Sequence, residues 1–221
     1  MSDDAATAEP PTQRGILCKV LVAASGNFLE WYDFAIFGIF AAEIGGAFFP
    51  IDESVSERQQ QQQALISSFT VYAGAFIVRP LGGVLFGAIG DRYGREKALL
   101  ATILLMALPT LTISVLPTYE QWGVAAAVLL SLLRMLQGVA AGGELPGALV
   151  YAVESAAPGR KGFFGAMVQA SGVGSLLASA VAGVLHATLG SDAVARWGWR
   201  IPFALGGLIA FLSWCAAAGA P

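Results

Sequence analysis

The sequence is poor in charged residues, in histidine and in cysteine. Asp, Glu, Lys and Arg make up 12% of its 221 residues, whereas about 25% is usual in soluble domains. One histidine and two cysteines, Cys18 and Cys215, have neither the spacing of a metal site nor that of a disulfide framework. Basic residues form no cluster outside short loops. These shortages exclude metal centres, disulfide-rich domains and a nucleic-acid partner.

Catalytic patterns are missing as well. No nucleophile and base occur at a useful spacing. The 27 glycines follow no predicted strand and match neither the P-loop nor the dinucleotide-binding pattern. We therefore expect neither an enzyme activity nor a cofactor.

Long apolar runs fill most of the chain. Apolar residues make up 56% of it, and its mean hydropathy is +0.68. About 20 apolar residues suffice for a helix to cross the hydrocarbon core of a bilayer. Six runs reach this length, at residues 15–48, 64–90, 98–116, 122–151, 162–189 and 199–218. The sequence predicts an all-α membrane protein with six transmembrane helices in one domain, residues 15–221, after a disordered cytoplasmic tail, residues 1–14.

The distribution of lysine and arginine predicts the orientation in the membrane, because cytoplasmic loops are enriched in both. One side of the predicted bundle carries Arg14, Lys19, Arg92, Arg95, Lys97, Arg160 and Lys161. The other side carries Arg58, Arg196 and Arg200. We therefore expect a multi-pass protein of the bacterial inner membrane with both termini in the cytoplasm. Trp197 and Trp199 suit an aromatic anchor at the outer interface.

Two local patterns predict helix starts and helix contacts. Ser54 and Glu57 have the spacing of a capping box that opens the second helix. Glycines four residues apart let helices approach closely. Such pairs are Gly83 and Gly87, Gly138 and Gly142, and Gly143 and Gly147.

Polar residues recur within the first apolar run. Asn27, Glu30 and Asp33 are spaced three apart, which keeps them within one broad stripe of a helix, and aromatic residues including Tyr32 flank them. An ionisable residue at membrane depth costs at least about 2.5 to 3.5 kcal/mol on insertion scales, so it needs a partner or a water-filled cavity. We expect this stripe to line a cavity.

Charges of the opposite sign occur in other apolar runs. Arg79 precedes Pro80, which predicts a kink beside a cation. Arg134 and Gln137 share a helix face, and Glu144 follows in a Gly-Gly-Glu-Leu-Pro-Gly segment. One interpretation is structural, with acid–arginine pairs locking the bundle. The other is functional, because a buried carboxylate beside an arginine can load and release a proton as a cavity opens to either side.

A basic hairpin joins the second and third runs. Gly94 permits the chain reversal, while Arg92, Arg95 and Lys97 hold the turn at the cytoplasmic side. Asp91 can accept hydrogen bonds from another helix's N-terminus. We expect the hairpin, with Gly87, to act as a gating latch. A signal for membrane topology alone explains the basic residues but neither Asp91 nor the glycines.

These motifs resemble those of the major facilitator superfamily and, within it, the metabolite:proton symporter family. The residues that carry the resemblance are Gly26-Asn-Phe-Leu-Glu-Trp-Tyr-Asp33, Arg79-Pro-Leu-Gly82, the hairpin from Gly87 to Lys97, Arg134-Met-Leu-Gln137-Gly138, Gly142-Gly-Glu144, Pro158-Gly-Arg-Lys-Gly-Phe163 and Trp197-Gly-Trp-Arg-Ile-Pro-Phe203. Members move α-ketoglutarate, citrate, shikimate, or proline and betaine. The resemblance implies six helices in two three-helix inverted repeats, with substrate bound near the bilayer midplane.

The resemblance also implies roles for the buried residues. Substrate would be bound by Arg79, Arg134, Asn27, Gln137 and Tyr32. Protons would be carried by Glu30, Asp33 and Glu144. The gate would be formed by Gly87, Asp91, Arg92, Gly94 and Arg95. The expected activity is proton-coupled symport of a small metabolite that bears a carboxylate.

The length differs from the family pattern. Family members have twelve spans, whereas this chain has six, so we expect a truncated half that needs a second six-helix half or a second copy of itself. A non-transporting membrane scaffold or regulatory subunit built on the same half-fold is the alternative.

Overall fold

The computed structural model describes residues 13–50, 54–156 and 159–219, and within them it contains helices and no strand. The all-α prediction is therefore confirmed. The helices are α1 (Gln13–Ile39), α2 (Ala41–Phe48), α3 (Glu57–Ile77), α4 (Arg79–Tyr93), α5 (Arg95–Val115), α6 (Tyr119–Trp122), α7 (Val124–Ser155), α8 (Lys161–Ala170), the 3₁₀ turn η1 (Ser171–Val173), α9 (Gly174–Leu189), α10 (Ser191–Ala193), the π turn η2 (Val194–Gly198) and α11 (Arg200–Ala218).

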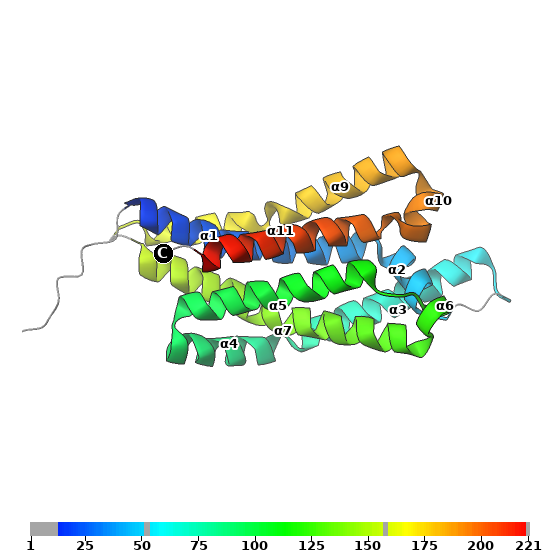
Figure 1. The fold of residues 1–221 in the computed structure, drawn as a ribbon, viewed down its shortest axis with the longest axis horizontal. Coiled ribbons are helices and arrows are strands. Elements are labelled where there is room, and N and C mark those ends of the chain that lie inside the picture. Colours follow the sequence, from blue (N-terminus) through cyan, green and yellow to red (C-terminus); the bar gives the residue numbers. More distant parts are fainter. Residues whose placement is uncertain (1–12, 51–53, 157–158, 220–221) are drawn as a thin grey trace, which may run out of the picture.

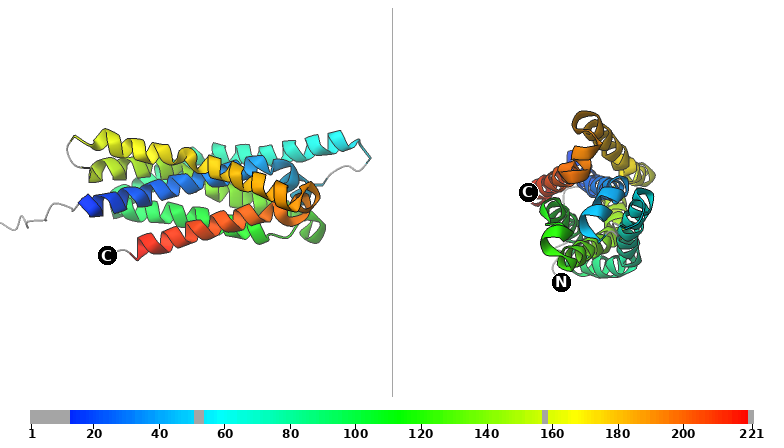
Figure 2. Two further views of the ribbon diagram at one scale, coloured as in Figure 1. Left: turned by 90° about the horizontal axis from the view of Figure 1, so that it is seen from above. Right: turned by 90° about the vertical axis from the view of Figure 1, so that its right-hand side faces the viewer.

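The long helices run side by side along the longest axis of the molecule (Figure 1). α1 begins and α11 ends at the same end of the bundle, which we call the terminal end, and the α4–α5 and α7–α8 connections lie there too (Figures 1 and 2). At the opposite end, which we call the far end, lie α2 and the turns that join α6 to α7 and α9 to α11. α1 packs against α7, α9 and α11. The basic connections, the start of α1 and the end of α11 therefore lie at one end of the bundle.

Five helical stretches are long and apolar enough to cross a membrane: Glu57–Tyr93, Arg95–Val115, Val124–Ser155, Lys161–Leu189 and Arg200–Ala218. They correspond to the second to sixth predicted spans. The first predicted span, residues 15–48, consists of α1 and α2 separated by Phe40. The expected kink at Arg79-Pro80 is present, because α3 ends at Ile77 and α4 begins at Arg79 with the proline in its first turn.

Two helix starts differ from the sequence-based expectation. The capping box of α3 is formed by Ser56 and Gln59, so the prediction of Ser54 and Glu57 was wrong. Two serines with the same spacing to a Glu or Gln compete here, and the chain uses the later one. α1 already begins at Gln13. Residues 1–12 of the predicted tail lie outside the described residues.

Aromatic side chains fill the core toward the far end of the bundle. Phe37, Phe40, Phe48 and Phe203 are fully buried there, and Trp199 packs edge-on against two of these rings. Trp199 is 0% exposed, so the prediction that it anchors the outer interface was wrong, whereas Trp197 is half exposed. The sequence Trp-Gly-Trp does not reveal which ring the η2 turn directs inward.

Glycines bring α7 into direct contact with α3 and α4. A Cβ atom on Gly82 would overlap the carbonyl of Val139, one on Gly138 the carbonyl of Ala75, and one on Gly142 the carbonyl of Arg79. These contacts join backbone to backbone, which only a residue without a side chain permits. Gly87 and Gly147 differ, since a Cβ on either would meet nothing within 4 Å. Close packing is therefore confined to part of the predicted glycine pairs.

Replacing Gly138 by alanine should destabilise the bundle by about 1–3 kcal/mol, because the new methyl group overlaps the backbone of α3. The matched control is Gly183→Ala in α9, where the methyl group meets open space and helix propensity should add up to about 1 kcal/mol of stability. The measurement is unfolding of the purified chain in detergent micelles titrated with dodecyl sulfate. Equal stabilities of the two variants would contradict the packing described.

Candidate transport site

A buried ion pair joins α1 to α7. The guanidinium of Arg134 contacts Asp33 Oδ2, and its Nη1 also donates to Gln137 Oε1 at 2.8 Å. Gln137 Nε2 donates in turn to Thr110 Oγ1 of α5 at 2.7 Å and to Asp33 Oδ1 at 3.2 Å. The Thr110 hydroxyl lies 2.9 Å from Asp33 Oδ1. Three helices thus contribute to one network around the Asp33 carboxylate.

This network is sealed. Asp33 is 3% exposed and Arg134 and Gln137 are 0% exposed. The face of the Phe37 ring lies 3.8 Å from the Arg134 guanidinium carbon, a cation–π geometry that stabilises the charge where water is absent. Arg134 Nε and Nη2 have no hydrogen-bond partner within the described part of the chain. Asp33 and Arg134 must stay paired in such surroundings, because a buried charge without its partner is strongly destabilising.

A second ion pair joins α1 to α4. Arg79 Nη2 lies 3.1 Å from Glu30 Oε1. The Arg79 guanidinium carbon lies 4.4 Å from the centroid of Phe34 and 4.1 Å from that of Phe76, two rings that pack edge to face with their centroids 5.3 Å apart. The side chain of Arg79 is 28% exposed, whereas that of Glu30 is 6% exposed. This arginine can therefore be reached from outside the bundle, unlike Arg134.

The spacing of α1 explains why one helix serves both pairs. Glu30 and Asp33 are three residues apart, so they project about 60° from each other around the helix, one toward α4 and the other toward α7. The Phe34 ring lies near both arginines, with its centroid 4.4 Å from the guanidinium carbon of Arg79 and 5.8 Å from that of Arg134. The position of α1 is consequently fixed against two helices at once.

Asn27 and Tyr32, both predicted to bind substrate, make contacts between helices in this structure. Asn27 Nδ2 donates to the carbonyl of Val168 at 3.1 Å and to Ser171 Oγ at 2.7 Å, where α8 gives way to η1. The Tyr32 hydroxyl donates to the carbonyl of Pro202 in α11 at 3.0 Å. Both side chains are buried. Within the described part of the chain, their hydrogen bonds run to α8, η1 and α11 and not to the two ion pairs.

Glu144 is a buried carboxyl group of another kind. It is 0% exposed, and neither oxygen has a hydrogen-bond partner among the residues described. Thr102 lies beside it but donates its hydroxyl proton to the carbonyl of Leu99 at 2.7 Å. The carboxyl group packs on Gly26 of α1 so tightly that a Cβ there would overlap Oε1. Glu144 is thus buried with no ion pair.

The basic hairpin lies at the terminal end of the bundle. Gly94 has φ +100°, a conformation that favours glycine, and it ends α4 and starts α5. Arg95 forms an ion pair with Asp91 at 2.6 Å, and the Arg92 guanidinium stacks over Tyr93. The Asp91 side chain is 70% exposed. The sharp reversal predicted at Gly94 is confirmed.

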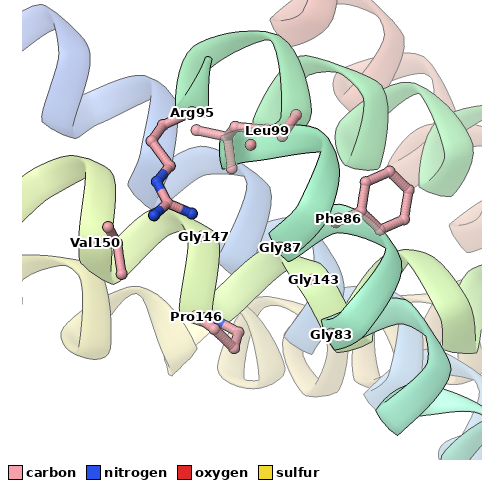
Figure 3. A pocket seen from close by; sticks show the side chains of 11 residues that line it. Gly83, Phe86, Gly87, Arg95, Leu99, Gly143, Pro146, Gly147 and Val150 are labelled. Carbon is pink, nitrogen blue, oxygen red and sulfur yellow. The ribbon is translucent and has the colours of Figure 1, made fainter. Parts of the chain in front are cut away.

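Arg95 also reaches into a cavity of about 80 Å³ between α4, α5 and α7. Figure 3 shows its side chain extending from the start of α5 toward Gly147 and Val150 of α7. Gly87 lines the same cavity. The structure therefore brings Gly87 and Arg95 of the predicted gate together around one hollow, while Arg92 contacts Tyr93 outside it.

Sequence reasoning missed Thr110, Phe34 and Phe76 as parts of the site. Thr110 follows a proline within an apolar run, and no pattern in the sequence links it to Asp33. The aromatic rings gave a weak signal, because phenylalanine is common throughout the apolar runs. Their role appears only once the arginines are placed.

Comparison with known proteins places the fold. The family model described as "Sugar (and other) transporter" matches residues 19–218. The chain belongs to this transporter family. It is 42% identical over 202 residues to the citrate-proton symporter of Salmonella typhi, covering 90% of this chain and 45% of that protein. It is 40% identical to the glycine betaine/proline/ectoine/pipecolic acid transporter OusA of Dickeya dadantii, covering 86% and 37% respectively.

A third relative is the putative proline/betaine transporter of Staphylococcus aureus, with 43% identity over 85% of this chain and 40% of that protein. The chain thus spans less than half the length of these relatives. Among solved structures, the xylose transporter XylE from E. coli in a partially occluded inward-open conformation has a TM-score of 0.77 at 21% identity, covering 93% of this chain and 50% of XylE. The fold is therefore that of half a major facilitator superfamily transporter, and the family is one of transporters and not of enzymes.

Removing one partner of the sealed pair should destabilise the bundle by about 3–5 kcal/mol, because an unpaired buried charge remains. We expect this loss for Asp33→Asn and for Arg134→Gln, and a smaller loss than the sum of the two when both are combined. The free energy of unfolding in detergent micelles measures it.

Asp91→Asn is the control, since it removes the exposed carboxylate of an ion pair on the surface. Its cost should be at most about 1 kcal/mol. Additive losses in the double variant at positions 33 and 134 would contradict a direct pair.

Proposed function

We propose that this chain forms half of a proton-coupled symporter for a small metabolite bearing a carboxylate. The observation that carries the proposal is the Glu30–Arg79 pair, in which a buried acid neutralises an arginine that is partly exposed. A substrate carboxylate can take the place of Glu30 on Arg79 once Glu30 has accepted a proton. Charge then stays balanced at membrane depth only if proton and substrate bind together.

The Asp33–Arg134 network has a different place in this proposal. It is sealed, and each of its partners already has a charge or hydrogen-bond partner, so in this conformation it acts as the fixed wall beside the exchangeable pair. Gln137 holds the carboxylate and the guanidinium in register. Substrate contact with Arg134 would require α1 and α7 to separate, as happens when a cavity opens in alternating access.

The substrate class rests on the relatives. Citrate carries three carboxylates, while proline and betaine carry one carboxylate and a cationic nitrogen. Phe34 and Phe76 flank Arg79, and aromatic faces are suited to a quaternary ammonium group. This favours the proline and betaine type over a tricarboxylate, because the exposed part of Phe76, which is 43% exposed, would lie beside the cationic end of the solute.

A second six-helix unit is part of the proposal. The relatives are more than twice as long as the matched segment, and one half provides a single wall of a central cavity. We propose that the terminal end faces the cytoplasm, since the basic residues Arg92, Arg95 and Lys97 gather there (Figure 1). The alternative is a non-transporting scaffold. The observation that fits it is the sealed Asp33–Arg134 network, because a structural role explains this network without any substrate.

Uptake into proteoliposomes tests the activity. The chain fused to the C-terminal half of the Salmonella citrate-proton symporter is expected to accumulate labelled glycine betaine or citrate under an inward proton gradient. The chain alone is expected to do so only where two copies of it associate. Collapse of the gradient should abolish accumulation. Uptake by neither form, with both recovered folded from the membrane, supports the scaffold and rejects symport.

Glu30→Gln tests the exchange on Arg79. The neutral amide mimics the protonated acid, so substrate binding should persist and lose its dependence on pH, while accumulation driven by the gradient should fall at least about 100-fold. Glu154→Gln, at an exposed position near the end of α7, is the matched control and should leave both unchanged. Binding that keeps its pH dependence in Glu30→Gln would contradict the assignment of the proton to Glu30.

A further inference from the structure

A hollow of about 450 Å³ lies at the far end of the bundle, away from the buried ion pairs. Its walls come from α2, α3, α6 and η2. Figure 1 shows α2, α6 and α10, which leads into η2, at that end. Small-molecule sites in proteins measure about 300–1,000 Å³, so this hollow has the size of one, whereas the cavity beside Arg95 is too small. None of its described lining residues has a role assigned above in binding substrate, carrying protons or gating.

Charges of both signs line this hollow without neutralising one another. Glu43 of α2 and Glu120 of α6 are its acids, and Arg196 of η2 is its base. Among the described residues, these three side chains form no ion pair. The hollow therefore presents a free cation and free carboxylates to whatever enters it.

Buried contacts hold the walls of the hollow in place. A Cβ atom on Gly45 would overlap the carbonyl of Ala64, so α2 packs directly on the backbone of α3. Phe48 at the end of α2 meets the edge of Trp199, the residue that follows η2, with the ring centroids 5.7 Å apart. Both rings are fully buried. Walls that are already fixed lower the entropy cost of binding a ligand.

The charged groups have free capacity for a ligand. Arg196 Nε donates to the carbonyl of Asp192 at 3.3 Å, which orients the side chain and leaves its two terminal nitrogens available. An arginine can bind a carboxylate through two parallel hydrogen bonds. Glu43 is half-buried and Glu120 is exposed, and both carboxylates attract a cationic nitrogen.

We propose that this hollow is a second solute site, which binds a small zwitterion with a carboxylate and a cationic nitrogen. The carboxylate binds Arg196, and the cationic nitrogen lies toward Glu43 and Glu120. A solute with several carboxylates is disfavoured, because two of the three charged side chains in the lining are negative.

The place of this site in a transport cycle follows from the orientation of the chain. With the terminal end in the cytoplasm, as proposed above, the hollow opens to the outside and collects solute before α1 and α7 separate. This collecting role rests on the proposed function. Binding in the hollow does not, because it can be measured in a chain that moves no solute.

Equilibrium binding of labelled glycine betaine to the chain in lipid nanodiscs tests the site. The background is the double variant Glu30→Gln with Arg79→Gln, which removes the inner pair as a unit and leaves neither charge unpaired. Binding should persist in this background, and Arg196→Gln added to it should weaken binding at least about tenfold. The matched control is Arg58→Gln, at an exposed arginine in the first turn of α3 outside the hollow, which should leave the affinity unchanged.

Two outcomes overturn the site: no binding in the double variant, or equal affinities after Arg196→Gln and Arg58→Gln. If the double variant is not recovered folded, the same two substitutions in the wild type decide. Arg196→Gln should then lower the number of glycine betaine molecules bound per chain by one, and an unchanged number overturns the site.

The charges of the probe give an independent test in the same background. Choline has the cationic nitrogen without the carboxylate, and acetate has the carboxylate alone, so each should bind at least about tenfold more weakly than glycine betaine. Arg196→Glu makes all three charged side chains of the lining acidic. This variant should lose glycine betaine and gain choline, a gain that an unfolded chain would not show. Choline binding that does not change, or citrate binding tighter than glycine betaine, overturns the zwitterion assignment.

Uptake separates this inference from the proposed function. In the fused form, Arg196→Gln should raise the half-saturating concentration of glycine betaine at least about threefold and leave the maximal rate unchanged, whereas Arg58→Gln should change neither. An unchanged half-saturating concentration overturns the collecting role. Binding in the hollow without uptake by any form contradicts the proposed function alone, and uptake without binding in the hollow contradicts this inference alone.

Discussion

Charges at membrane depth must be paired, and this requirement sets the position of α1. Its two acids, Glu30 and Asp33, each meet an arginine from a different helix. Insertion of either charge alone costs several kcal/mol, so a rotation or slide of α1 that breaks one pair breaks both. The two ion pairs therefore fix the position of α1 along and around its axis. Apolar packing alone would define that position only loosely. The rest of the candidate site depends on that position.

Glycine packing makes the pairing possible. Contacts without side chains at Gly82, Gly138 and Gly142 bring α7 against α3 and α4, and Arg79 and Arg134 start from these same helices. With larger residues the two arginines would stand further apart, and one α1 could not reach both through residues only three apart. Apolar helices in a membrane have no hydrophobic driving force to associate with each other. Close packing and ion pairs thus support the same arrangement.

Sequence reasoning identified the helices, the kink at Arg79 and the acids and arginines, because hydropathy and the cost of buried charge are properties of a segment. It left open which acid meets which arginine, since residues 30 and 33 both lie within the stripe and the partners depend on helix placement. It did not foresee that Asn27 and Tyr32 would bridge helices, because an amide or a phenol serves packing and binding equally well. The role of Thr110 also depends on a contact across 77 residues.

The three buried acids differ in what lies beside them, and this difference divides their possible work. Asp33 is enclosed by a cation, an amide and a hydroxyl, so changing its charge would disrupt three helices at once. Glu30 is paired with an arginine whose side chain is 28% exposed, and the proposed exchange of anions rests on that exposure. Glu144 has no arginine beside it, and the neighbours of its carboxyl group are Gly26, Ile103 and Thr102, so no cation balances an ionised form. The sealed pair, the partly exposed pair and the acid without a cation therefore differ in how each meets the cost of a charge in a low-dielectric interior.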